Sequence, residues 1–255
     1  VEDACKVAEC AASLLDCDAS EILTASTGVI GSRLPLDKIT GVIPSLVEGL
    51  SSSEETAHNA EFAMMTTDTV PKEVSAQIEL TDGKTVTISG MAKGSGMIHP
   101  NLATMICVFT TDCGIESASL KKMLQKAVKY TFNRVSVDGD TPVCDMVIVL
   151  ANGASGVEVT EGSEDYKLVE DALCELSEDI ARMLASDGEG ATKLLECIVT
   201  GANSKETAVT VSKSVICSSL FKAAMFGADA NWGRVLCAIG YSGADVDVTK
   251  IDVLA

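Results

Sequence analysis

The stretch SAQIELTDGKTVTISGMAKG, residues 75–94, is the feature that most restricts how this chain can fold. Apolar and polar residues alternate on both sides of Asp82-Gly83, a pair favoured in the tight turns of β-hairpins. The stretch therefore predicts two antiparallel strands. A Gly-rich loop follows, and KGSGMIHPNLATMICVFTTD, residues 93–112, then becomes apolar at Ala103-Thr104. We expect a third, buried strand whose first residue is Thr104.

Helices and strands alternate through the remainder of the chain. Apolar residues at helical spacing predict amphipathic helices, and short apolar runs predict buried strands. The expected helices span residues 1–17, 117–132, 164–184 and 205–227, and the further strands span 145–153 and 194–202. No linker or low-complexity tract separates them, so we predict one continuous α/β unit with a mixed sheet.

Charge and hydropathy narrow the range of functions. The chain has 37 acidic and 19 basic residues, and its net charge of −18 opposes binding to nucleic acid or to anionic membranes. No apolar run approaches the roughly 20 residues that cross a bilayer. We therefore expect a cytoplasmic protein that acts on small molecules. Because the chain begins with Val1 inside a helical pattern, we also expect its true N-terminus to lie upstream.

The ten cysteines and two histidines are expected to form neither disulfides nor a metal site. No C-x-x-C pair occurs, and most cysteines lie in apolar runs typical of buried free thiols. The chain has only two histidines, His58 and His99, which are few ligands for a Cys/His zinc cluster. The sequence SLKK, Ser119–Lys122, fits the acylating S-x-x-K pattern, but no S-D-N motif accompanies it, and we assign it to an ordinary amphipathic helix.

Thr104 is the candidate nucleophile. A threonine hydroxyl is activated when threonine is the first residue of a chain, because its own α-amine then acts as base. The pKa of that amine is near 8, so it accepts protons at neutral pH. The hydroxyl creates such a terminus if it attacks the Ala103 carbonyl within a strained turn, for which the loop glycines and Pro100 are suitable. Lys93, at the loop entrance, is placed to assist. An ordinary hairpin exit before a strand would contain the same residue types.

Six blocks of the sequence together resemble the ornithine acetyltransferase family, the glutamate N-acetyltransferases of arginine biosynthesis. The blocks are STGVIGSRLPLDKI, MTTDTVPKE, KGSGMIHPNLATMICVFTTD, FNRVSVDGDT, SDGEGATKL and FGADANWGRVLCAIGYSG. They follow the family's order from about residue 20 to the end of the chain. The resemblance implies an α/β fold, a layered mixed-sheet sandwich of the self-processing, DmpA-like type.

The resemblance also implies a processed enzyme. The precursor would cleave itself between Ala103 and Thr104, leaving an α-subunit part, residues 1–103, and a β-subunit part, residues 104–255, both woven into one α/β unit. Family members extend beyond both ends of this chain. Two cleaved α chains and two β chains are expected to form a heterotetramer or a larger assembly.

The activity that the resemblance implies is a ping-pong transfer of an acetyl group. Thr104 would take acetyl from N2-acetylornithine, release ornithine, and pass the acetyl group to glutamate. No cofactor or metal is expected, and acetyl-CoA stays open as a second donor. Two alternatives also stay open: a related self-processing amidase or aminopeptidase that passes the acyl group to water, and a catalytically incomplete fragment of such an enzyme.

Further site residues follow from the matching blocks. Thr27 and Gly28 correspond to the family's oxyanion hole, and a hydroxyl beside an unhindered N–H suits that role. Lys93 and Glu189 match substrate-binding residues, and a carboxylate is a suitable partner for the ammonium groups of ornithine.

The stretch TTDT, residues 66–69, is expected to add a substrate-contacting hydroxyl from Thr67 or Thr69. We expect Trp232 and Arg234 to be structural, with the tryptophan packed and the arginine paired. The chain departs from the family pattern D-T-S-T-N-D, which is DTPVCD here, at residues 140–145.

Overall fold

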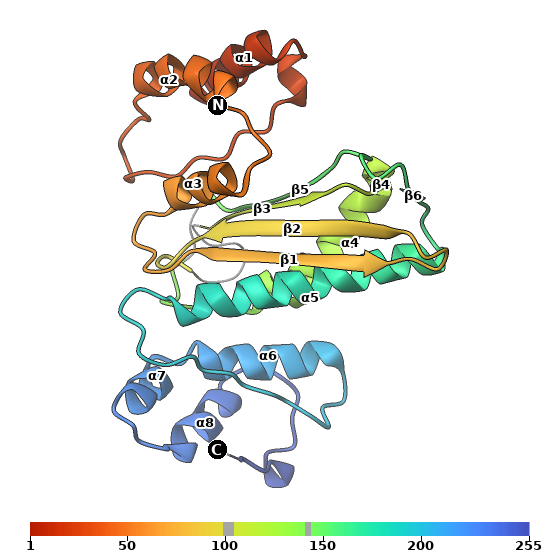
Figure 1. Ribbon diagram of the computed structural model, residues 1–255. Coiled ribbons are helices and arrows are strands. Elements are labelled where there is room, and N and C mark those ends of the chain that lie inside the picture. The colour runs from red at the N-terminus through yellow and green to blue at the C-terminus, as the bar shows by residue number, and fades with distance from the viewer. Residues whose placement is uncertain (99–104, 141–143, 255) are drawn as a thin grey trace. The chain divides into compact units, whose positions relative to one another are not determined.

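The computed structural model describes residues 1–98, 105–140 and 144–254, and the chain divides into two compact units, Val1–Met64 and Met65–Ala255 (Figure 1). Ala103 and Thr104, the predicted cleavage pair, lie outside the described residues.

The first unit is helical. It contains α1 (Glu2–Leu15), the 3-10 turn η1 (Ala19–Glu21), α2 (Leu36–Glu48) and α3 (Glu54–Met64). α1 packs on α2, and their buried residues are Ala8, Ala12 and Ile43. The predicted first helix is confirmed. The sequence does not predict α2, because Gly41 and Pro44 within it are both unfavourable in a helix interior.

The second unit is built on a four-stranded mixed sheet of order β1-β2-β3-β5. The strands are β1 (Lys72–Glu79), β2 (Thr85–Lys93), β3 (Ile106–Thr111) and β5 (Met146–Ala151). β2 runs antiparallel to both β1 and β3, whereas β5 runs parallel to β3. The predicted α/β class with a mixed sheet is therefore confirmed.

The predicted hairpin joins β1 and β2. The Leu80 N–H donates to the Lys84 carbonyl at 2.8 Å, and Gly83 has φ +80°, a left-handed conformation that glycine adopts without steric cost. β2 also pairs with β3, so segments before and after the predicted cleavage point belong to one sheet. The division into two subunits stays a prediction.

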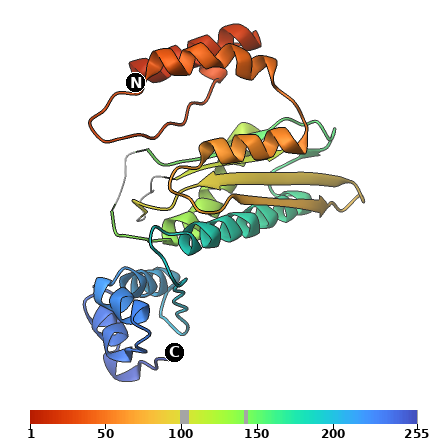
Figure 2. The ribbon, with the colours of Figure 1, turned by 60° about the vertical axis from the view of Figure 1, so that its left-hand side comes forward.

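Two helices, α4 (Ser117–Tyr130) and α5 (Glu164–Ser186), pack against each other and cover one face of the sheet (Figure 2). α5 contacts β1 and β2, and α4 contacts β5. Buried residues of α5 recur every three or four positions, which is why this face of the helix enters the core; they include Val169, Leu173, Leu176, Ile180 and Leu184. A short parallel pair, β4 (Gly114–Ile115) and β6 (Glu158–Val159), lies apart from the main sheet.

The S-x-x-K pair lies in the first turns of α4. Glu116 caps this helix by accepting the Ser119 N–H at 2.9 Å. The Ser119 hydroxyl donates to Glu161 at 3.0 Å, and Lys122 Nζ binds the same carboxylate at 2.9 Å. Both side chains are therefore held by a carboxylate, which confirms that this segment is an ordinary amphipathic helix.

The C-terminal part contains α6 (Lys205–Ile216), α7 (Ser219–Phe226), α8 (Trp232–Gly240) and the 3-10 turn η3 (Val248–Lys250). The prediction of one helix over 205–227 is wrong, because the Ser218 hydroxyl accepts the Phe221 N–H and begins a new helix.

The predicted strand over residues 194–202 is also wrong, since this segment pairs with no described strand. Its alternating residues Cys197 and Val199 pack instead against a second apolar cluster that includes Val211, Val215 and Ala238. The alternation of apolar and polar residues therefore does reflect burial, but the apolar residues pack against helices rather than within a sheet.

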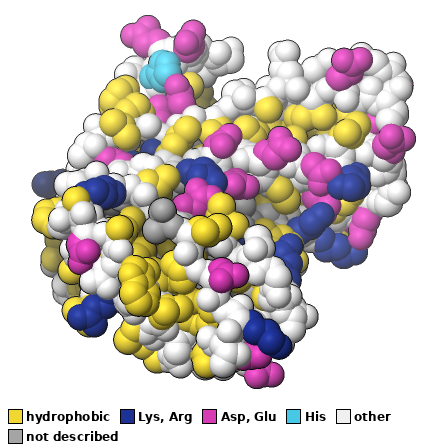
Figure 3. Space-filling model, turned by 90° about the horizontal axis from the view of Figure 1, so that it is seen from below, with side chains coloured by type: hydrophobic (Ala, Val, Ile, Leu, Met, Phe, Trp, Pro, Cys, Tyr) yellow, Lys and Arg dark blue, Asp and Glu magenta, His cyan; other side chains and the backbone are white. Residues whose placement is uncertain are grey.

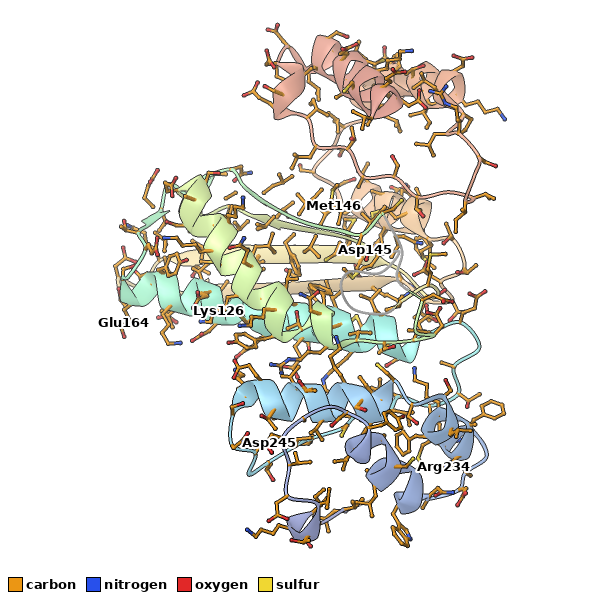
Figure 4. All side chains as sticks on the ribbon, turned by 180° about the vertical axis from the view of Figure 1, so that it is seen from behind. Lys126, Asp145, Met146, Glu164, Arg234 and Asp245 are labelled. Carbon is orange, nitrogen blue, oxygen red and sulfur yellow. The ribbon has the colours of Figure 1, made fainter. Side chains whose placement is uncertain are left out.

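Two expectations about single residue types need correction. None of the ten cysteines, all of which lie in the described ranges, forms a disulfide, and only Cys107 and Cys113 are buried. Burial, aided by nearby carboxylates, raises the pKa of Cys113 to about 11. Trp232 is 65% exposed rather than packed. Arg234, labelled in Figure 4, forms none of the ion pairs found among the described residues.

No single helix among the described residues is long and apolar enough to cross a bilayer; α6 and α7 reach that length and composition only as a pair bent by 56°. The C-terminal helices expose several large apolar side chains, and Figure 3 shows such side chains gathered at this end of the second unit.

Gly90, in the middle of β2, tests the packing of α5 on the sheet. A Cβ atom there would lie 2.5 Å from Phe109 Cδ1 and 3.3 Å from Ile180 Cδ1. We expect Gly90→Ala to lower the free energy of unfolding by about 1–3 kcal/mol, as overpacked cores do. Urea unfolding measures the change. Gly240→Ala, where an added Cβ meets nothing within 4 Å, is the matched control and should change stability little.

Candidate active site

Three strands of the main sheet meet at the end where β2 finishes and where β3 and β5 begin. Lys93 pairs with Ile106, and Ile106 pairs in turn with Met146, so the three residues form one row across the sheet. β3 starts two residues after Thr104, so the predicted nucleophile closely precedes this end of β3 in the sequence.

Lys93 is a buried cation at this end of the sheet. Its side chain is only 3% exposed, and Nζ donates to Thr66 Oγ1 at 2.9 Å. Burial lowers the pKa of Lys93, while the carboxylates of Asp68 and Asp145 act in the opposite direction. Of its three donors, only one has a partner among the described residues. Lys93 is therefore equipped to bind an anionic group of a ligand.

A buried ion cluster holds the neighbouring chain segments together. Lys72 Nζ, fully buried, lies 2.8 Å from Asp68 Oδ1 and 2.6 Å from Asp187 Oδ2. Asp68 also accepts the Gly94 N–H at 2.6 Å, and Asp187 accepts both the N–H and the hydroxyl of Thr69. Burial by itself would raise the pKa of Asp187, but the hydrogen bonds from Lys72 and Thr69 lower it to about 2. The cluster thus joins residues 66–72, the end of β2 and the end of α5.

Glu189 follows this cluster and lies beside the Gly-rich loop. Its N–H donates to the Ser95 carbonyl at 2.6 Å, and its carboxylate lies so close to Gly96 that a side chain at Gly96 would collide with it. The Ser95 hydroxyl is 2.6 Å from Thr67 Oγ1. Gly96 is therefore required for the close approach of the carboxylate to the loop backbone.

Asp138 holds the part of the loop that precedes residue 99. Its carboxylate accepts the N–H groups of Met97 and Ile98, and the Val137 N–H donates to the Ile98 carbonyl. Met97 has φ +56°, which is costly for a residue with a side chain. The described part of the predicted processing loop is thus held in a strained conformation by an external carboxylate.

Asp145 precedes β5 and faces the beginning of β3 (Figure 4). Its Oδ1 accepts the Met105 N–H at 2.9 Å, whereas Oδ2 is buried and has no hydrogen-bond partner among the described residues. Burial raises the pKa of Asp145 to about 6, despite the Met105 hydrogen bond and the charge of Lys93. A carboxyl group with such a raised pKa, hydrogen-bonded to the residue that follows Thr104 in the sequence, is typical of a functional site.

A cavity of about 620 Å³ opens beside Glu189. Apolar side chains such as Leu195 and Phe226 line it together with the cationic Arg134 and Lys222. Lys222 Nζ donates to the carbonyl oxygens of Ser136 and Val137, and burial lowers its pKa. The cavity has room for an amino-acid-sized ligand beside a carboxylate.

The structure brings Lys93, Glu189, Thr67 and Thr69 together around residues 93–96 and 187–189, as described above. Their contact with substrate stays a prediction. Thr27, half-buried, and Gly28, exposed, lie in an irregular segment of the first unit, and their role as oxyanion hole stays a prediction too. The residues that sequence reasoning missed are Asp68, Lys72, Asp138, Asp145 and Asp187. Four of them fall within the quoted blocks, but their long-range partners could not be inferred from those blocks.

Known proteins are similar to this chain in sequence and in part of its fold. A crystal structure of arginine biosynthesis bifunctional protein ArgJ from Bacillus halodurans superposes with a TM-score of 0.52 and 46% identity, over 54% of this chain and 65% of that one. The ArgJ family matches residues 1–255, and the chain belongs to that family.

Curated relatives agree with this assignment. Arginine biosynthesis bifunctional protein ArgJ 1 of Clostridium acetobutylicum is 48% identical over 253 residues, which cover 99% of this chain and 61% of the relative. A protein named glutamate N-acetyltransferase, from Methanocaldococcus jannaschii, is 47% identical over 260 residues, which cover the whole chain and 62% of the relative. The chain therefore spans about three-fifths of the length of these relatives.

Lys72 is the residue on which the ion cluster depends. We expect Lys72→Met to lower the free energy of unfolding at pH 7 by about 3–5 kcal/mol, because it leaves two buried carboxylates without a counter-charge. Urea unfolding at several pH values measures the effect.

The pH dependence provides the check. The pKa values of Asp68 and Asp187 are lowered in the folded protein, that of Asp187 to about 2. The stability that Asp187 contributes is therefore complete above about pH 4 and is lost as the pH falls toward 2, and that of Asp68 is lost in the same direction. In Lys72→Met the two carboxylates take up protons more readily, because the lysine charge no longer favours their ionised form. The difference in the free energy of unfolding between wild type and variant should therefore be smaller at pH 4 than at pH 7. A difference independent of pH would contradict the role assigned to this charge.

Proposed function

We propose that this chain is part of an enzyme that transfers an acetyl group from N2-acetylornithine to glutamate through an acetyl ester of Thr104. The observation that best supports the proposal is the convergence of a buried cation, Lys93, and a carboxylate, Glu189, on the loop that leads to Thr104. Membership of the ArgJ family, whose relatives include proteins named glutamate N-acetyltransferase, supports the same activity.

The proposed nucleophile arises by self-cleavage. Thr104 Oγ1 adds to the Ala103 carbonyl carbon, the Ala103–Thr104 C–N bond breaks, and the departing nitrogen takes the hydroxyl proton and becomes the α-amine. Water then hydrolyses the resulting ester, which frees the hydroxyl. The strained backbone at Met97 and its restraint by Asp138 support this step, because a distorted loop raises the energy of the uncleaved state.

Acetyl transfer then proceeds in two balanced halves. The Thr104 α-amine accepts the hydroxyl proton as Oγ1 bonds to the acetyl carbonyl carbon of N2-acetylornithine. The tetrahedral intermediate collapses, the C–N bond to ornithine breaks, and the leaving amine takes the proton from the α-ammonium. In the second half, the amine of glutamate attacks the acetyl ester, gives its proton to the α-amine, and expels Oγ1, which regains that proton.

The other residues are assigned to binding and charge stabilisation. Thr27 Oγ1 and the Gly28 N–H are proposed to donate to the tetrahedral oxyanion, where one such donor is worth roughly 3 kcal/mol of barrier height. Glu189 is proposed to bind the side-chain ammonium of ornithine, and Lys93 a substrate carboxylate. Thr67 and Thr69 are the proposed hydroxyl contacts.

The whole protein is proposed to work in the cytoplasm as a heterotetramer of two α and two β chains, without a resident cofactor. Native mass spectrometry measures the assembly. Acetyl-CoA is proposed as an additional donor, in keeping with relatives that are named bifunctional.

Intact mass spectrometry tests the reaction. We expect the purified protein to separate into two pieces that meet at Ala103–Thr104, and the piece beginning with Thr104 to gain one acetyl group from N2-acetylornithine. Thr104→Ala should remain a single chain and gain nothing. A wild-type chain that stays whole, or an acetyl group on another residue, would contradict the proposal.

Glu189→Gln tests substrate binding. Loss of a charged hydrogen bond costs about 1.5–3 kcal/mol, so the KM for N2-acetylornithine should rise roughly 10- to 100-fold. The KM for glutamate, which has no side-chain ammonium, should change less. Glu175→Gln, an exposed position on α5, is the control. Equal effects of the two substitutions on the donor KM would remove Glu189 from the site.

A further inference from the structure

Only one of the two carboxylate oxygens of Asp145 forms a hydrogen bond with the described residues. Oδ1 accepts the Met105 N–H, and the pairing of Met146 N–H with the Met105 carbonyl at 3.0 Å holds Asp145 in register with the start of β3. Oδ2 is shielded from solvent and has no partner among the described residues. Leaving such an atom without a partner is costly, which indicates a polar or charged group of the working enzyme beside it.

Covalent geometry limits which group that is. The backbone nitrogen of residue 104 is separated from the Met105 nitrogen by two carbon atoms, which keeps the two nitrogens within about 4 Å of each other in any conformation. The two oxygens of a carboxylate are spaced to contact two donors at such a separation. A carboxylate that holds the Met105 N–H is therefore within reach of the nitrogen before it.

We propose that Asp145 is a positioning residue that binds the α-ammonium of Thr104 through Oδ2 while holding the Met105 N–H through Oδ1. The inference rests on the proposed function, because the ammonium exists only after cleavage at Ala103–Thr104. Asp145 thereby orients the amine toward the Thr104 hydroxyl and stabilises the positive charge that the amine acquires when it accepts the hydroxyl proton.

The charges around Asp145 are few. Lys93, at the end of β2, is the described cation that acts on it, and Lys93 is itself influenced by Asp68 and Lys72. Because the amine must be neutral to act as base, activity rises as the pH increases through the pKa of the amine. A neighbouring carboxylate favours the ammonium and raises that pKa, so removing the carboxylate must lower it.

The experiment compares Asp145→Asn with Asp112→Asn. Asp112 is a matched control, because its Oδ1 accepts the Thr87 N–H at 2.7 Å beside the opposite end of β3. Both substitutions remove one charge and keep an oxygen that accepts the backbone hydrogen bond. We expect Asp145→Asn to move the acid limb of kcat for acetyl transfer to lower pH by about one unit and to lower kcat about tenfold at high pH, with little change in KM. Asp112→Asn should do neither.

The following outcomes would overturn the inference. An unmoved acid limb, or an equal movement in both variants, removes Asp145 from the amine. An Asp145→Asn protein that is as stable as Asp112→Asn but stays uncleaved assigns Asp145 to cleavage instead.

If Asp145→Asn does not fold, Asp145→Glu replaces it. The retained charge should keep the acid limb near its wild-type position while kcat falls, and a limb moved by a full unit would contradict the inference. Intact mass of the wild-type protein separates the two proposals, because failure to cleave or to form the acetyl ester rejects the function itself, whatever Asp145 does.

Discussion

The ion cluster around the buried ammonium of Lys72 is the interaction on which the candidate-site end of the second unit depends. The ammonium lies between Asp68 and Asp187, which are 119 residues apart in the sequence, and each of these carboxylates also accepts a backbone N–H. Buried ion pairs add little net stability, since desolvation offsets much of the attraction. Their value here is geometric. A cluster with every charge partnered has one arrangement of low energy, and that arrangement sets where Lys93 and Glu189 lie.

Acidic side chains hold the ends of the strands and the loop before residue 99. Asp68, Asp112, Asp138 and Asp145 each accept backbone N–H groups at these places. Part of the net charge of −18 is thus bound into the structure rather than exposed. The excess of negative charge also gives the buried Lys93 a particular importance, because an anionic ligand needs a local cation to bind to an acidic protein.

Elements with a strong local pattern were predicted correctly. The hairpin follows from two alternating runs around Asp82-Gly83, and α4 and α5 follow from apolar residues at helical spacing. The predictions of secondary structure were wrong where packing against other parts of the chain, rather than the local pattern, determined the conformation. Residues 194–202 alternate as a strand would, yet they pack on helices, and the long apolar run from Lys205 was divided by the cap at Ser218. α2 formed despite Gly41 and Pro44, because packing on α1 outweighs weak local propensity.

For the candidate site, the sequence by itself determined which residue types were present and in what order: a threonine after a Gly-rich loop, a lysine at the loop entrance, and a glutamate between glycines. Local patterns carry that information because they depend on neighbours a few residues away. Only the tertiary structure decided that Lys72 reaches Asp187 across 115 residues and that Asp145 meets Met105 across 40. Such pairings depend on strand register and on how helices lie on the sheet, and an isolated carboxylate in a sequence gives no sign of which N–H or ammonium it will face.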